Sequence, residues 1–198
     1  MTQPIVSLTE YANKLSIALQ EIDNDKVKTF YDMIYYAIKY NKRIYVIGNG
    51  GSAAIASHFQ GDFVKCVAED STLVPQVISL VDNNPIVTAI ANDISYDEVF
   101  SKQIEWYGND DDLLIAISSS GNSLNIVNAV KEAKYKNMKV VSISGFGGGE
   151  ISKLSHLSIV INSDNYGIVE DATSAILHYI NQSFRCGFSK GKPEDIKY

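Results

Sequence analysis

The stretch RIYVIGNGGSAAIASHFQGD, residues 43–62, decides the fold of this chain. A short apolar run rich in β-branched residues, 43–48, ends in a glycine loop, and a helix-compatible segment, 52–66, follows it. Continuous apolar strands separated by helices are typical of a parallel sheet that is covered on both faces. Similar apolar runs occur at 76–81, 113–118, 139–144 and 157–162. Helix-compatible segments lie between them at 97–107 and 123–136. The sequence therefore predicts a doubly wound α/β fold.

Predicted helices precede and follow this α/β core in the sequence. From Ser7 onward apolar residues recur at spacings of three and four, and Ser7 with Glu10 fits a capping box. A second helix is expected at 25–40 and a last one at 168–186. We therefore predict one domain, 1–198, made of an N-terminal helical hairpin (1–40), an α/β core (41–186) and a loosely held polar tail (187–198).

Composition narrows the class of function. The net charge of −6, without any basic stripe, argues against a nucleic-acid partner. No apolar stretch approaches the roughly 20 residues of a membrane span, and the N-terminus lacks the regions of a signal peptide. Cys66 and Cys186 have no metal-type spacing, so we expect reduced thiols. These features predict a cytoplasmic protein that acts on a small molecule.

The loop GNGGS, residues 48–52, is typical of an anion site, because glycines let backbone N–H groups approach a ligand closely. It is not a dinucleotide fingerprint, which would need a glycine at Ala53, and the chain contains no Walker loop. A glycine turn that serves packing alone is the alternative.

A second loop, SSSGNS at 118–123, directly follows an apolar strand and precedes a helix. Its hydroxyls, the free backbone N–H groups and the helix dipole would all favour a phosphate without help from Arg or Lys. A serine-rich helix cap is the alternative, although one serine would be enough for that. Together the two loops predict a phosphorylated small-molecule ligand.

Ionisable side chains lie on the helices that follow. His58 and Asp62 are four residues apart and share a helix face, where they could hold a metal ion or transfer protons. An ordinary exposed pair is the alternative. His178 could be a satisfied core residue, and Glu170 could complement the dipole of its helix. His156 is expected to be structural or exposed.

Four motifs, in this order, resemble the sugar-isomerase (SIS) domain family: GNGGSAAIASHF, AIANDISYDEVFSKQ, LLIAISSSGNS and NYGIVEDATSAILH. They are most similar to its phosphoheptose isomerase branch, which converts sedoheptulose 7-phosphate to D-glycero-D-manno-heptose 7-phosphate. The likeness spans nearly the whole chain, including the helical hairpin. It implies a Rossmann-like, five-stranded parallel sheet, a homotetramer with active sites between subunits, and heptose synthesis for a bacterial surface glycan.

The resemblance also implies roles for single residues. It places phosphate binding on Ser118, Ser119, Ser120 and Ser123, and other substrate contacts on Asn49, Gly50, Gly51, Ser52, Asn92, Asp93 and Glu170. Metal binding and proton transfer fall on His58, Asp62, Glu170 and His178, with Zn²⁺ as the implied ion, one per site.

Three positions depart from the family pattern. Asp62 stands where the family has Glu, and Glu170 stands where it has Gln. Cys66 replaces an expected Arg, for which Lys65 could substitute. The result is a set of two imidazoles and two carboxylates, which is chemically credible for zinc. The shorter Asp62 must reach farther than Glu would.

Glu170 and His178 pose a geometric problem, since eight residues of helix separate them by about 12 Å and about 80° around the axis. Three solutions stay open. The metal could lie between the two side chains, Glu170 could belong to the turn before the helix, or the ligands could come from different subunits.

The reaction implied by the resemblance is an aldose–ketose isomerisation through a cis-enediolate. It needs a base and an acid on neighbouring carbons, and we assign these roles to Asp62 and His178. Two alternatives remain at this stage. One is a non-catalytic SIS protein that binds the replication initiator, and the other is an isomerase or sensor of a different phosphosugar.

Overall fold

A computed structural model describes residues 7–191 of the chain. Its centre is a five-stranded sheet in the order β2-β1-β3-β4-β5, in which every neighbouring pair is parallel. The strands are β1 (Arg43–Ile47), β2 (Gln76–Ser79), β3 (Leu113–Ile117), β4 (Lys139–Ser144) and β5 (Leu157–Val160). All five predicted strands are present, and the predicted doubly wound α/β class is confirmed.

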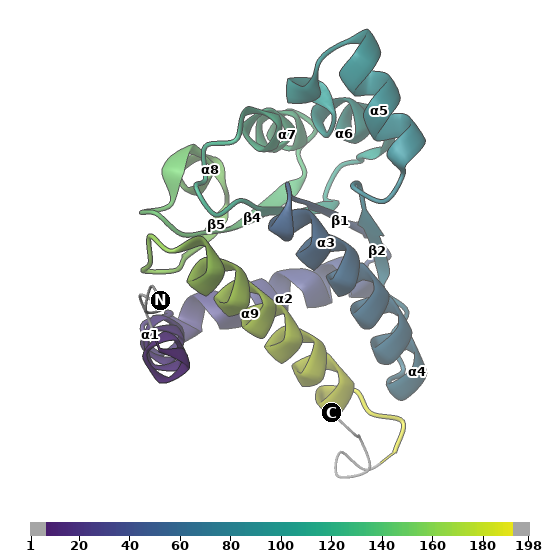
Figure 1. The fold of residues 1–198 in the computed structure, drawn as a ribbon. Coiled ribbons are helices and arrows are strands. Elements are labelled where there is room, and N and C mark those ends of the chain that lie inside the picture. The colour runs from purple at the N-terminus through teal and green to yellow at the C-terminus, as the bar shows by residue number, and fades with distance from the viewer. Residues whose placement is uncertain (1–6, 192–198) are drawn as a thin grey trace.

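Helices cover both faces of the sheet (Figure 1). On one side lie α1 (Leu8–Gln20), α2 (Asn24–Lys39), α3 (Gly51–Asp62), the π-helical turn η1 (Phe63–Val67), α4 (Ala68–Asp70) and α9 (Tyr166–Gly187). On the other lie α5 (Asn84–Asp93), the 3-10 turn η2 (Tyr96–Glu98), α6 (Ser101–Tyr107), α7 (Leu124–Tyr135) and α8 (Gly149–Leu154).

The central strand β3 explains why its sequence is continuously apolar. Side chains alternate between the two faces of a strand. Leu113, Ile115 and Ile117 pack with α2, α3 and α9, whereas Leu114 and Ala116 pack with α6 and α7. Every residue of β3 is therefore buried, and an alternating polar pattern would place polar groups in one of the two cores.

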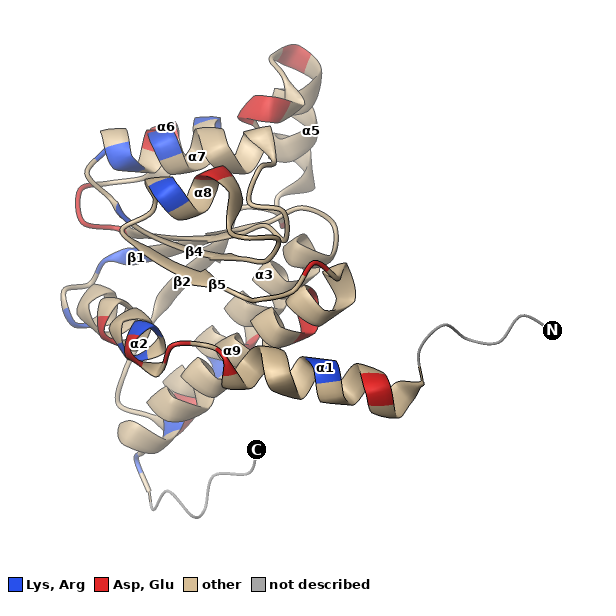
Figure 2. Ribbon diagram, turned by 90° about the vertical axis from the view of Figure 1, so that its left-hand side faces the viewer, with Lys and Arg blue, Asp and Glu red and all other residues tan. Residues whose placement is uncertain are grey.

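The helical hairpin of α1 and α2 begins at the predicted cap. The Ser7 Oγ accepts the Glu10 N–H at 3.1 Å, but the Glu10 carboxylate pairs with Lys14 at 2.9 Å, so only half of the capping box forms. The Tyr11 hydroxyl donates to Asp171 of α9 at 2.7 Å, and this hydrogen bond raises the pKa of Tyr11 to about 12. The N-terminal end of α1 extends away from the body of the molecule (Figure 2).

Two helices longer than a single turn were not predicted, and two predicted helices are interrupted. The helix expected at 52–66 changes into the π-helical turn η1 after Asp62, and the one expected at 97–107 divides into η2 and α6. The unpredicted helices are α5 and α8. Asn and Pro at the start of α5 are typical of a loop, but proline is also favoured in the first turn of a helix.

The start of the predicted tail is fixed rather than loose. Phe188 stacks on Tyr35, and Ser189 forms an antiparallel bridge with Ser71. The Lys190 N–H then donates to the Asp70 carbonyl at 2.9 Å. A polar composition alone does not reveal these backbone contacts. Residues 192–198 of the tail lie outside the described part of the chain.

In residues 7–191 no helix combines the length and the apolar character that a membrane span requires.

Candidate functional site

The two predicted loops meet at one cavity. They follow β1 and β3, which are neighbours at the point where the strand order reverses, and ligands of such sheets bind at this point. The cavity has a volume of about 270 Å³. It is lined by Asn49, Gly50, Gly51, Ser52, Ser118, Ser119, Ser120, Ser123, Tyr166 and Glu170. Apart from Tyr166, the sequence identified all of these residues.

The serine loop does more than cap a helix. Ser123 precedes α7 at the N-cap position, yet within the described chain its side chain makes no capping hydrogen bond. Asn125 accepts the Ile126 N–H at 3.0 Å instead. The Ser123 hydroxyl lines the cavity at the N-terminus of α7, where an anion is stabilised. In residues 7–191 a side-chain cap on α7 by Ser123 is therefore not formed, whereas Ser118 and Ser120 accept backbone N–H groups within the loop at 3.2 and 3.3 Å.

The charge of the cavity comes from Glu170. Among the described residues that line it there is no Lys or Arg, so hydroxyls, backbone N–H groups and the α7 dipole would bind an anion. A Cβ added to Gly51 would lie 2.5 Å from both Glu170 carboxylate oxygens. The carboxylate thus packs on the first residue of α3, where the helix dipole favours its negative charge.

Asn49 joins the two loops. It forms a reciprocal amide pair with Asn125, with N···O distances of 2.8 and 2.9 Å, and it accepts a hydrogen bond from the Tyr96 hydroxyl at 3.0 Å. These contacts hold the glycine loop in place, and Asn49 also lines the cavity. Sequence reasoning missed Asn125, although it lies only two residues after SSSGNS.

A glycine-rich turn after β4 supports the serine loop, and sequence reasoning did not connect the two. Phe146, Gly147, Gly148 and Gly149 all have positive φ, from 49° to 96°. The Ile151 N–H donates to the Gly121 carbonyl at 3.0 Å. Gly121 has a φ of +67°, and a Cβ there would lie 2.0 Å from the Gly148 carbonyl oxygen.

Replacement of Gly121 with Ala is therefore expected to displace the serine loop. The left-handed conformation alone costs an L-residue about 1–2 kcal/mol, and the backbone clash adds to this. We expect a lower melting temperature and phosphate binding weakened at least about tenfold, measured by thermal unfolding and calorimetry with inorganic phosphate. Gly191→Ala is the control, since its Cβ would meet nothing within 4 Å. Equal phosphate binding by Gly121→Ala and the wild type would contradict this role.

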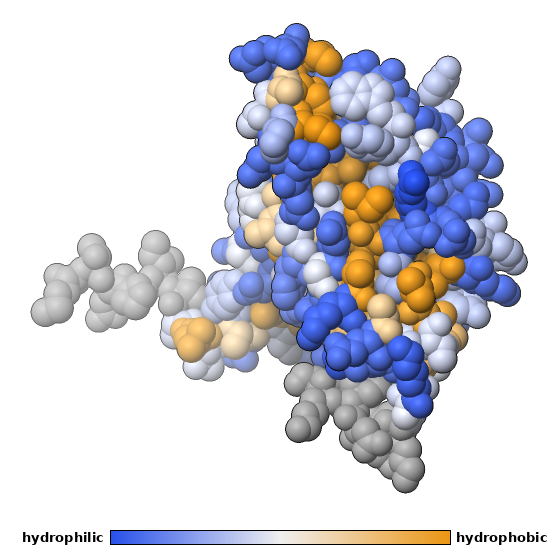
Figure 3. Space-filling model, turned by 90° about the vertical axis from the view of Figure 1, so that its right-hand side faces the viewer, coloured by the Kyte–Doolittle hydropathy of each residue, from blue (hydrophilic) through white to orange (hydrophobic). Residues whose placement is uncertain are grey.

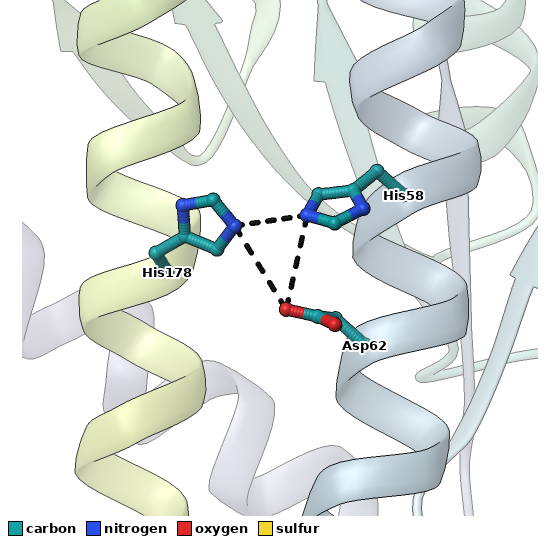
Figure 4. Close-up of side chains that lie close together, drawn as sticks. All are labelled: His58, Asp62 and His178. Atoms are coloured by element: carbon teal, nitrogen blue, oxygen red, sulfur yellow. Dashed lines mark hydrogen bonds and ion pairs between the residues drawn. The ribbon is translucent and has the colours of Figure 1, made fainter. Parts of the chain in front are cut away.

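Farther along α3 and α9, three of the four predicted metal-binding residues come together (Figure 4). The Nε2 atoms of His58 and His178 are 2.9 Å apart, and the Asp62 Oδ2 lies 3.8 Å from each. The His58 and His178 side chains are 58% and 48% exposed, so the group is open to solvent. Such a group could hold a metal ion or move protons on a substrate.

Glu170 does not belong to this group of three. Because α9 is continuous from Tyr166 to Gly187, Glu170 lies inside the helix and not in a turn before it. About 12 Å of helix rise separates it from His178. One of the three solutions left open by the sequence is thereby excluded, and Glu170 contacts the polar cavity instead.

The other predicted residues lie elsewhere. Asn92 and Asp93 are exposed near the end of α5, bonded to each other at 2.8 Å, and do not line the cavity. Lys65 is 76% exposed and lies 3.9 Å from a glutamate of its own helix. His156 is structural, since its Nδ1 accepts a backbone N–H of β4 at 3.0 Å. Burial lowers the pKa of His156, which favours this neutral acceptor.

Comparison with known proteins identifies the protein family to which the chain belongs. The SIS domain model matches residues 9–145, and the chain belongs to the SIS domain family. A probable phosphoheptose isomerase of Thermoplasma volcanium is 32% identical over 176 residues, covering 89% of both chains. The phosphoheptose isomerase of Sulfurimonas denitrificans is 39% identical over 140 residues, covering 71% of both. Within the family, the chain falls in the phosphoheptose isomerase branch, as the sequence motifs predicted.

A solved structure agrees with this placement. The phosphoheptose isomerase of Francisella tularensis superposes with a TM-score of 0.83 at 26% identity, covering 89% of this chain and 94% of that one. The shared fold therefore extends over most of both chains.

Proposed function

We propose that this chain is an aldose–ketose isomerase that interconverts sedoheptulose 7-phosphate and D-glycero-D-manno-heptose 7-phosphate. The prediction of an isomerase of this branch is confirmed by its relatives named phosphoheptose isomerase. One structural observation carries the proposal. The same two helices, α3 and α9, present the serine-lined cavity at their N-termini and the group of His58, Asp62 and His178 about two to three turns later.

This arrangement separates phosphate binding from proton transfer. The serine loop binds the phosphate, and the binding energy there positions the carbonyl end of the sugar. Asp62 removes a proton from the carbon beside the carbonyl, which gives the enediolate. His178 then delivers a proton to the neighbouring carbon, while the hydroxyl proton of the first carbon passes to the former carbonyl oxygen, and the carbonyl moves to the first carbon. General acid–base catalysis of this kind contributes about 10²–10⁴-fold.

We also propose that His58, Asp62 and His178 bind Zn²⁺. Bonds of about 2.0–2.1 Å in tetrahedral geometry place neighbouring ligand atoms roughly 3.3 Å apart, and the observed 2.9 and 3.8 Å bracket this value. Three protein ligands that leave one position open are typical of catalytic zinc. When bound, the ion would polarise the substrate carbonyl. An atom that binds the ion cannot exchange a proton at the same time, so the ligand role and the proton-transfer role compete at Asp62 and His178. Glu170 is left to contact the substrate in the cavity.

A homo-oligomer, and specifically a tetramer with sites between subunits, is part of the proposal. Asn92 and Asp93 are exposed and do not line the cavity of their own chain, so we place their role at the site of a partner subunit. Figure 3 shows several hydrophobic patches on the side that carries α5 and the edge strand β2, where Ile78 and Ile94 are exposed. A cytoplasmic location and a role in surface-glycan heptose synthesis stay predictions.

Isotope exchange tests the enzyme against a non-catalytic sugar-phosphate binder. In heavy water, proton removal and return should introduce deuterium at C1 of sedoheptulose 7-phosphate and at C2 of the aldoheptose 7-phosphate product, as followed by NMR. A protein that only binds the sugar phosphate would leave these carbons unlabelled. That result, with binding of the sugar phosphate intact, would reject catalysis by this site.

A further inference from the structure

One buried polar side chain lies beside the group formed by His58, Asp62 and His178. Asn181 lies on α9, three residues after His178, and is only 3% exposed. Its Nδ2 donates to the Asp62 Oδ2 at 3.3 Å. Its Oδ1 is buried and has no hydrogen-bond partner among the described residues. Half of this amide is therefore committed to Asp62, and the other half is unsatisfied.

The fold itself gives little reason for an amide at this position. Asn181 lines a small cavity of about 10 Å³ between α3 and α9, together with three apolar residues and with Ser174, His58, Asp62 and His178. Its carbonyl oxygen has no hydrogen-bond partner among the described residues. Burial of an unpaired carbonyl oxygen is unfavourable, and a leucine of similar size would avoid it. The value of the amide therefore lies in its contact with Asp62 and not in the stability of α9.

The hydrogen bond from Asn181 is made to the Asp62 oxygen that faces the two histidines. The Asp62 Oδ2 that accepts from Asn181 is the same atom that lies 3.8 Å from the Nε2 of both His58 and His178. A hydrogen bond to it limits the rotation of the carboxylate and keeps this oxygen facing the two imidazoles. Because the donor is a neutral amide, it adds no positive charge that would repel a cation.

We propose that Asn181 is a positioning residue, which holds Asp62 ready for a divalent cation bound by His58, Asp62 and His178. Outer groups that orient metal ligands typically change metal affinity 10–100-fold when they are replaced. The inference rests on the proposed metal site and not on the identity of the sugar. It also explains how the short side chain of Asp62 is kept in place.

The test compares Zn²⁺ and Co²⁺ affinity in the wild type and Asn181→Leu, by competition with a chromogenic chelator. We expect metal binding weakened about 10–100-fold, an altered visible spectrum of bound Co²⁺, and a melting temperature of the metal-free protein that is unchanged or higher. Asn181→Ala, which needs less space, gives the same comparison if the leucine variant does not fold. Gln103→Leu is the control, because it removes a buried amide from the opposite layer of the fold.

The results for Asn181→Leu, the wild type and the control each support or reject the positioning role of Asn181. Equal metal affinity and an equal Co²⁺ spectrum in Asn181→Leu and the wild type would overturn the positioning role and leave the metal site intact. A lower melting temperature with unchanged affinity would show that the amide serves stability alone. If the wild type binds neither ion, both the proposed metal site and this inference are rejected. If Gln103→Leu loses as much affinity as Asn181→Leu, the effect is not specific to Asp62.

Discussion

Replacement of Asp62 with Asn is expected to lower turnover by about 10²–10⁴-fold while the protein stays folded. The amide has the shape of the carboxylate but cannot accept the substrate proton. Asp62 lies 37% exposed on α3, and in the described chain its polar contacts are to His58, His178 and Asn181, so the variant disturbs no core packing. Turnover of sedoheptulose 7-phosphate, measured beside circular dichroism, checks the result.

The metal content of the same variant separates two roles of Asp62. Lost turnover with retained metal assigns Asp62 as the base, whereas loss of both assigns it mainly as a ligand. Asp62→Glu is the matched control, because it keeps a carboxylate, and we expect it to stay active. Near wild-type turnover in Asp62→Asn would show that neither role is correct.

Replacement of His178 with Gln should have an effect of similar size. Glutamine keeps a polar side chain on α9 but cannot exchange protons near neutral pH, so the enediolate would not be reprotonated by this group. It also removes one imidazole of the pair that is 2.9 Å apart, and metal affinity should fall with turnover. Steady-state kinetics and metal titration measure both effects.

His156→Gln is the control for the histidine change. His156 accepts a backbone N–H of β4 and lies outside the site, so its loss should affect stability and spare turnover. Unchanged turnover in His178→Gln would exclude His178 as the acid.

The sheet was predictable because each strand carries its own signal. Because β3 is buried on both faces, it is apolar at every position. Burial favours apolar residues in the neighbouring strands for the same reason. The helix α5 carries no such signal. Its first residues, Asn84 and Pro85, are typical of a turn, and only the structure shows that Asn83 caps a helix there.

The candidate site was predictable where its residues are close in sequence. His58 and Asp62 share a helix face, and the serines form one loop. The spacing of Glu170 and His178 already indicated a separation, but its explanation was not predictable, because it depends on where α9 begins. Asn181 was missed because a single polar residue in an apolar helix has no periodic signal, and its importance comes from a neighbour 119 positions away.

The most direct test of the central claim is incubation of the purified protein with sedoheptulose 7-phosphate, with and without a chelator, followed by analysis of the sugar phosphates. The account predicts an aldoheptose 7-phosphate product that disappears with the chelator and returns when Zn²⁺ is added back. If equal amounts of product form with and without the chelator, the proposed zinc site is contradicted but the proposed isomerase activity is not. No aldoheptose under any of these conditions, including added Zn²⁺, would contradict the proposed function.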